Sequence, residues 1–234
     1  MMNWEIFVRR RAAQGLACSF AFIISAGAGV FAQGTYKITS ANQIPSDVPA
    51  AVSGVLNAQG TSLNDATGSP VSSIWWAKTI AATPGGSADA AYPDLAVGTF
   101  LGVLNFPKGG SDFRGQKIKP GTYTLRYAHI PQDGNHMGVN PYPDFVLLIP
   151  VASDTDSSKG LALPDLVKLS KLTSGTNHPA VMSLVPAAQG ASFPSLVQDD
   201  QGHWVLQVEV SEGSASGSKP MPLALIVVGQ TTAG

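Results

Sequence analysis

The stretch DFRGQKIKPGTYTLRYAHIPQDGNHMG, Asp112–Gly138, decides the fold that the sequence predicts. Pro120-Gly121 is a turn dipeptide, and Thr122–Ile130 then alternates with the two-residue period of a β-strand. One face of this strand carries Tyr123, Leu125, Tyr127 and His129, and the other carries Thr122, Thr124 and Arg126. β-Branched and aromatic residues suit a pleated, half-buried surface. We therefore expect a sheet with an apolar inner face and a polar outer face.

Similar strand patterns recur on both sides of this stretch, separated by turn-forming residues. They predict strands at Tyr36–Thr39, Thr61–Asp65, Pro70–Ile80, Gly98–Phe106, Asp144–Val151, Pro179–Val185, Phe193–Val197, His203–Val210 and Leu223–Val228. Two short helices are expected at Ser46–Asn57 and Leu163–Thr173, the second with a buried stripe of Leu166, Leu169 and Leu172. The Gly- and Ser-rich segment Ser211–Pro220 is expected to be a loop.

Short strands divided by turns, without the strand–helix alternation of a parallel sheet, are typical of all-β domains. We therefore predict an all-β fold, an antiparallel β-sandwich or jelly roll with two short helices. No internal repeat or change in composition divides the chain after its first segment. One domain of residues 33–234 is expected.

The first 32 residues have the pattern of a signal peptide. Arg9–Arg11 are basic, Ala12–Phe31 carry no charge, and Val30 and Ala32 supply small residues before a cleavage site. We expect cleavage after Ala32, by ordinary secretion rather than the lipoprotein or twin-arginine route. The mature chain would be periplasmic or extracellular, with no membrane span. An uncleaved membrane anchor is the alternative.

Composition excludes several classes of partner. The only cysteine, Cys18, lies in the predicted signal peptide, so the mature chain would have no disulfide and no cysteine metal site. Charged residues make up 12% of the sequence, and the net charge is −1 with no block of basic residues after the signal. Nucleic acid and anionic membranes are therefore not expected as partners.

Histidines are the main candidates for chemistry. His129 and His136 flank one polar loop, Asp144 follows it, and His178 precedes another strand. Three imidazoles and a carboxylate suit copper or zinc, and a rigid sheet would hold them well. The alternative is that each histidine braces a loop by hydrogen bonding. His203 is expected to face outward and is left out of this site.

Two further positions are candidate ligand contacts. Trp75 and Trp76 could stack on a glycan, although neighbouring strand residues point to opposite faces and core packing is the alternative. Arg126 could bind an anionic ligand, or it could pair with an acidic residue of a neighbouring strand.

Four segments, DFRGQKIKPGTYTLRY, DGNHMG, DFVLLIPVASD and SGTNHPAVMSL, resemble an uncharacterised family of exported bacterial β-sandwich proteins. The resemblance covers roughly Pro70–Val185. It implies export and a sandwich fold, and the family pattern includes positions matching His136 and His178 but not His129. It implies no activity.

The sequence carries no nucleophile elbow, phosphate loop, dinucleotide fingerprint or HExxH helix. We therefore expect an exported, non-catalytic protein with a binding or structural role at the cell envelope. Its partner would be a small molecule, a glycan or an envelope protein. The alternative is a copper- or zinc-binding protein, perhaps a metalloenzyme, that uses the loop histidines.

Overall fold

A computed structural model of the protein describes residues 35–83, 89–130, 142–214 and 217–231. All of them belong to one compact unit, residues 33–234. The predicted signal peptide and His136 lie outside the described residues. The described chain is mostly β-strand with two α-helices, which confirms the β-rich part of the predicted fold.

The strands are short and follow the predicted order closely. They are β1 Lys37–Ala41, β2 Gly60–Asn64, β3 Pro70–Trp76, β4 Ile80–Ala81, β5 Phe100–Phe106, β6 Gly110–Ser111, β7 Lys117–Ile118, β8 Gly121–His129, β9 Asp144–Pro150, β10 Val181–Val185, β11 Ser195–Gln198, β12 Trp204–Ser214 and β13 Gly217–Val228. The helices are α1 Ala50–Ser53 and α2 Leu163–Ser174, with a 3₁₀ turn at Val151–Ser153. Among the described residues, no helix has the length and apolar character needed to cross a membrane.

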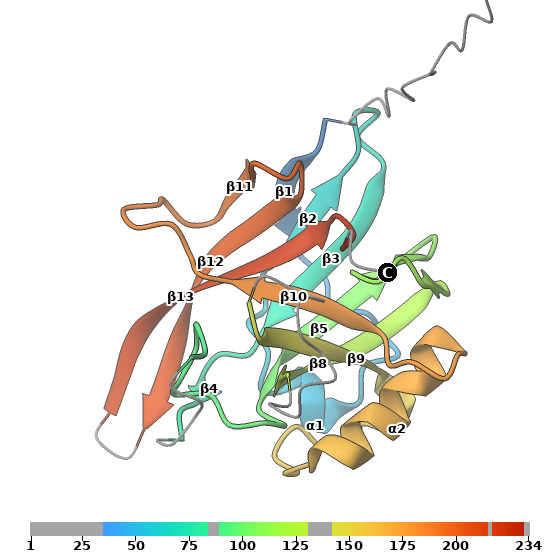
Figure 1. Ribbon diagram of the computed structural model, residues 1–234, viewed down its shortest axis with the longest axis vertical. Helices are drawn as coiled ribbons and strands as arrows, with labels where there is room; N and C mark the ends of the chain where they lie inside the picture. The colour runs from blue at the N-terminus through green and yellow to red at the C-terminus, as the bar shows by residue number, and fades with distance from the viewer. Residues whose placement is uncertain (1–34, 84–88, 131–141, 215–216, 232–234) are drawn as a thin grey trace, which may run out of the picture. The chain divides into compact units, whose positions relative to one another are not determined.

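Most strands belong to one curled sheet in the order β1-β2-β3-β5-β8-β9-β10-β13-β12-β11 (Figure 1). Neighbours along this path are antiparallel, while β4 adds a parallel pair to β12, and β6 and β7 form a separate hairpin. The two ends of the sheet approach each other, because the ring of Tyr36 meets that of Trp204 edge-on at 5.7 Å between centroids. The sheet is thus continuous and mixed, and two separate packed antiparallel sheets are not confirmed.

The main core lies inside this curl. Apolar residues of β8, such as Leu125, pack in the same buried cluster as Leu206 of β12 and Leu225 of β13. The rest of the sheet contributes Leu104 and Val146 to the same cluster. The curl therefore lets strands from both halves of one sheet share a single hydrophobic core.

The predicted polar face of β8 is buried, which corrects the expectation of a solvated side. Thr124 and Arg126 are as inaccessible as Leu125 on the inner face. The outer face lies under α2 and the segment after β9, where Ala128 packs with Leu166. A strand buried on both faces needs internal partners for its polar side chains, and β8 has them.

Three local predictions are wrong. The first helix has only four residues, between Pro49 and Gly54, because both neighbours are poor helix formers. Leu172, expected to be buried, is 61% exposed. The expected loop Ser211–Pro220 is instead the outer part of the β12–β13 hairpin, which projects beyond the rest of the sheet in Figure 1.

Candidate functional site

Asp144, one of the predicted metal ligands, is the first residue of β9 and is fully buried. Its Oδ1 accepts hydrogen bonds from the Tyr127 hydroxyl at 2.7 Å and the Tyr92 N–H at 3.2 Å. Its Oδ2 accepts one from the Ala91 N–H at 2.8 Å. A carboxylate held by three donors is well satisfied without a cation. Asp144 therefore anchors the segment before β5 to the sheet.

His129 and His178 lie at opposite ends of β9. His129 pairs with Asp144 at the beginning of β9, whereas the segment leading from His178 into β10 runs beside its far end. Six residue steps along a strand span about 20 Å. His129 and Asp144 therefore do not share one ion with His178, and a copper or zinc site that uses His136 stays a prediction. His136 lies outside the described residues, and no three potential ligands group together within the described ranges.

Two histidines contact acidic loop residues instead. The Nε2 of His129 lies 3.5 Å from an Asp89 carboxylate oxygen. His203, expected to face outward, is buried, which corrects that prediction. Its Nδ1 lies 2.9 Å from Asp199 Oδ2, and its Nε2 lies 3.2 Å from the carbonyl oxygen of Gln230. The His203 contacts are hydrogen bonds of the loop-bracing kind, whereas the Nε2 of His129 makes no hydrogen bond to the described residues.

Arg126 does not face a ligand, which corrects its assignment as a ligand contact. Its Nε and Nη2 each donate to a different carboxylate oxygen of Asp154, both at 2.7 Å. The remaining N–H groups reach the carbonyl oxygens of Gly98, Asp156, Ser157 and Lys159. The guanidinium also lies over the Phe100 ring, 5.3 Å from its centroid. With every donor used, Arg126 organises the segment after β9.

Trp75 and Trp76 are 4% and 5% exposed and belong to the main core. Stacking on a sugar needs an open ring face, so the predicted glycan platform is wrong. The indole of Trp75 packs against Gly60, where an added Cβ would lie 2.8 Å from its Nε1. Core packing, the alternative for these two residues, is what the structure shows.

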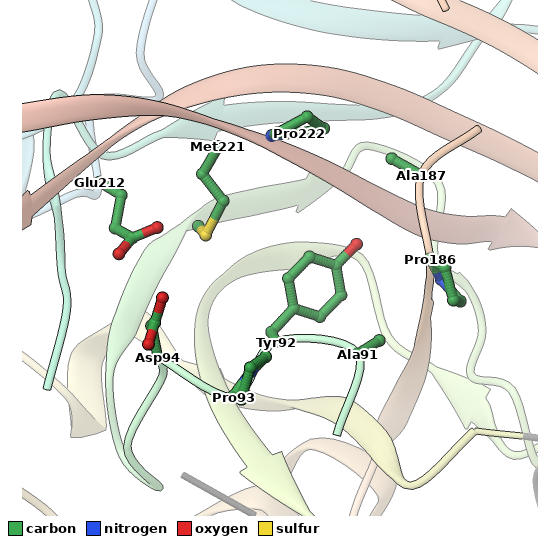
Figure 2. Close-up of a pocket in the computed structure, with 9 residues that line it drawn as sticks. All are labelled: Ala91, Tyr92, Pro93, Asp94, Pro186, Ala187, Glu212, Met221 and Pro222. Atoms are coloured by element: carbon green, nitrogen blue, oxygen red, sulfur yellow. The ribbon is translucent and has the colours of Figure 1, made fainter. Parts of the chain in front are cut away.

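A cleft that the sequence did not predict lies where the segment before β5, the segment after β10, and the β12–β13 hairpin meet (Figure 2). We call it the acidic cleft, and its volume is about 300 Å³. Its apolar wall consists of Tyr92, Pro93, Pro186, Met221 and Pro222. The carboxylates of Asp94 and Glu212 face each other at one end, as Figure 2 shows.

Tyr92 fixes the floor of the acidic cleft. Its hydroxyl donates to the Val185 carbonyl oxygen at 2.6 Å and accepts from the Ala224 N–H at 2.9 Å. These residues face each other where β10 and β13 pair. Burial raises the pKa of Tyr92 far above its usual value, so the hydroxyl stays neutral. The ring is thereby held at one position between two strands.

The charges of the acidic cleft are shared with one lysine. The ammonium of Lys219 lies 3.2 Å from a carboxylate oxygen of both Asp94 and Glu212. Hydrogen bonds to Asp94 and then Glu212 raise the pKa of Lys219. Glu212 is 5% exposed, whereas Lys219 is 63% exposed. The Lys219 ammonium thus forms ion pairs with two carboxylates from segments more than 100 residues apart in the sequence.

One signal in the sequence could have revealed this cleft. The inward residues of β12 are at even positions, including Val208 and Val210, and Glu212 continues that series. An acidic residue at an inward strand position needs a partner. Asp94 carries no such signal, because it lies in an irregular Gly-, Ala- and Pro-rich segment.

Comparison with models of known families, with characterised proteins and with solved structures finds no match for this chain. The resemblance to an exported bacterial family therefore stays a prediction.

Proposed function

We propose that this is an exported, non-catalytic binding protein whose acidic cleft binds a ligand carrying an ammonium group on an apolar body. The observation that carries the proposal is the convergence of Asp94 and Glu212 at one end of an otherwise apolar cleft. Small-molecule sites combine apolar walls with a few converging polar groups. The position of the Lys219 ammonium marks where a ligand cation would lie.

The non-catalytic part of the proposal rests on how other ionisable groups are used. In the described parts of the chain, buried Arg126, Asp144 and Asp154 are engaged by internal partners. Buried Asp112 likewise accepts hydrogen bonds from Gln116 and the Val181 N–H. Groups occupied in this way hold loops to strands. Turnover on a panel of ester, glycoside and peptide substrates would contradict this part of the proposal.

Export and the finer fold description are also proposed. The signal pattern of residues 1–32 supports cleavage after Ala32, and N-terminal sequencing of the secreted chain tests it. The shared core of the curled sheet supports a sandwich-like arrangement of its two halves.

Ligand binding is best tested with n-butylammonium as the probe and n-butanol as its uncharged counterpart. Chemical shifts of the Met221 methyl group report on the cleft wall. We expect n-butylammonium to bind in the millimolar range and n-butanol to bind at least about tenfold more weakly, because only the cation gains charge-assisted hydrogen bonds. Equal binding of the two probes would contradict the proposal.

Matched variants locate the contact. Glu212→Gln should weaken n-butylammonium binding by about tenfold, whereas Glu209→Gln, on the same strand but outside the cleft, should leave it unchanged. Lys219→Met should strengthen binding by about two- to fivefold, because it removes a competing ammonium whose own side chain is 63% exposed. An unchanged affinity in Glu212→Gln would place the ligand elsewhere.

A further inference from the structure

We infer a second binding site, for a neutral saccharide, between the two ends of the curled sheet. A cleft of about 550 Å³ lies there, within the size range of small-molecule sites. One wall comes from β1, β2 and the end of β3, and the other from β12 and the segment before β11. We call it the seam cleft and define it by Thr39, Asn57, Gln59, Trp76, Phe193 and Glu209.

The polar groups of the seam cleft suit hydroxyl groups rather than ions. Its lining contains neither lysine, arginine nor histidine, and Glu209 is its only carboxylate. Amide and hydroxyl side chains such as Asn57 and Gln59 both donate and accept hydrogen bonds, as sugar hydroxyls do. The Asn57 and Glu209 side chains are exposed and make no hydrogen bond to other described residues. They are available to a ligand, and Glu209 disfavours an anionic one.

The apolar groups of the seam cleft suit the apolar faces of a sugar ring. Phe193 is half-buried, so part of its ring remains accessible beside the polar wall. A pyranose ring presents C–H groups on its faces and hydroxyls at its edge, and aromatic rings pack against such apolar faces. Trp76 also borders the cleft, and its buried Nε1 has no hydrogen-bond partner in the described structure. That nitrogen is enclosed by protein atoms, so the aromatic contact with the ligand is assigned to Phe193.

This inference does not depend on the acidic cleft. The two clefts share no lining residue, and their carboxylates on β12, Glu209 and Glu212, lie at odd and even positions and therefore on opposite faces of the strand. Binding of a saccharide and binding of an ammonium ion can therefore succeed or fail separately.

The experiment titrates the mature chain with cellobiose, maltose and lactose, and with glucuronate as an anionic probe. Intrinsic tryptophan fluorescence reports on Trp76 together with Trp75 and Trp204, and amide chemical shifts locate the site. We expect at least one neutral disaccharide to bind in the millimolar range, and glucuronate to bind more weakly. Failure of all three disaccharides at about 50 mM, or tighter binding of glucuronate, would overturn the inference.

Variants decide whether the seam cleft is the site. Asn57→Ala removes an exposed side chain without a described partner, so it should leave the fold intact and weaken binding at least about fivefold. Phe193→Ala should weaken it by a similar factor. Val197→Ala, an exposed residue of β11 outside the cleft, is the control and should change nothing. Unchanged affinity in both Asn57→Ala and Glu209→Ala would overturn the assignment.

Discussion

Arg126 shows how a charged residue in the central strand can be buried without being a ligand site. Its two paired hydrogen bonds to Asp154 have the fork geometry that a guanidinium makes with a carboxylate. Thr124, two residues earlier on the same face, donates to the same carboxylate at 2.6 Å. The pair therefore joins β8 to the segment that follows β9.

Breaking this pair should be costly. Arg126→Met leaves the buried Asp154 carboxylate without its cation, and we expect a loss of about 3–5 kcal/mol in the free energy of unfolding. Urea denaturation measures it, with the exposed Arg114→Met as the control that should change stability by less than about 0.5 kcal/mol. The double variant Arg126→Met, Asp154→Asn should lose less than the sum of the single variants. A loss below about 1 kcal/mol in Arg126→Met would show that the pair is not essential.

Tyr127 should make the free energy of unfolding fall with rising pH in the alkaline range. Burial, followed by the hydrogen bond to Asp144 and its charge, raises the pKa of Tyr127 far above its usual value near 10. Above about pH 10 the unfolded chain loses a tyrosine proton that the folded chain keeps. The contribution of such a tyrosine to the free energy of unfolding should therefore be constant below this pH and fall as the pH rises above it, by about 1.4 kcal/mol per pH unit.

The control for this pH dependence is Tyr127→Phe. The variant should be about 1–2 kcal/mol less stable at pH 7, because Asp144 loses a donor. Its stability should then fall less steeply above pH 10, leaving the contributions of Tyr92 and Tyr123, whose pKa values burial also raises. Urea denaturation between about pH 10 and 11.5 measures how the free energy of unfolding of each protein changes with pH. If this slope is the same for wild type and variant, Tyr127 does not cause the pH dependence.

For single residues, the sequence predicted which face of a strand a side chain lies on better than it predicted whether that face is buried. It assigned Tyr127 and Arg126 to opposite faces of β8, and both are there. It did not predict that the second face is covered, because Asp154 lies 28 residues away and nothing in the local pattern links it to Arg126. A contact between side chains so far apart in the sequence forms only in the tertiary structure, so a local sequence pattern does not predict it.

Helix α2 covers the outer face of the sheet with a narrower apolar stripe than predicted. Leu166 is fully buried against Leu147 and Ile149, whereas Leu172, six residues later, is 61% exposed. The helix ends at Gly175, whose φ of 66° is the left-handed conformation expected of a helix-terminating glycine. The sequence therefore predicted the extent of this helix but not how far its contact with the sheet continues.

Two leucines of this helix provide a matched pair of variants. Leu166→Ala removes a fully buried side chain and should lower the free energy of unfolding by about 2–5 kcal/mol. Leu172→Ala makes the same chemical change at an exposed position and should change it by less than about 0.5 kcal/mol. Urea denaturation of both variants measures the difference. Similar losses in the two would mean that α2 packs through another face.

The β12–β13 hairpin explains why Ser211–Pro220 has the composition of a loop yet forms strands. β10 pairs with β13 only at Ala224 and Leu225. Between the hairpin turn and Ala224, the edge of β13 that faces away from β12 has no neighbouring strand among the described residues. Pro220 and Pro222 lie two residues apart on this segment and remove donors at that edge. Prolines and a nearby lysine, Lys219, are typical protection for an exposed strand edge. Turn-like residues here protect an edge rather than end a strand.

For the whole molecule, the sequence predicted the order and class of the elements but not the closure of the sheet. Alternation identified β8, β9 and β12 to within a few residues, because strand periodicity is local. Curling brings β1 beside β11, and no local pattern specifies that contact. The acidic cleft was missed for the same reason, since Asp94 and Glu212 meet only once the sheet has folded over.

The contact between Tyr36 and Trp204 joins the two ends of the sheet, and Tyr36→Ala tests how much it contributes to closure. An edge-to-face aromatic pair contributes about 0.5–1.5 kcal/mol beyond the area that it buries, so we expect a loss of about 1–3 kcal/mol in the free energy of unfolding. Hydrogen exchange should accelerate in β1, the edge strand next to Tyr36, while protection in the central strand β8 is retained. Tyr142→Ala, at a more exposed tyrosine outside this contact, is the control and should leave β1 protected. If Tyr36→Ala loosens β8 as much as β1, the two ends of the sheet unfold together with its centre, and closure of the sheet is part of the global fold rather than a local contact.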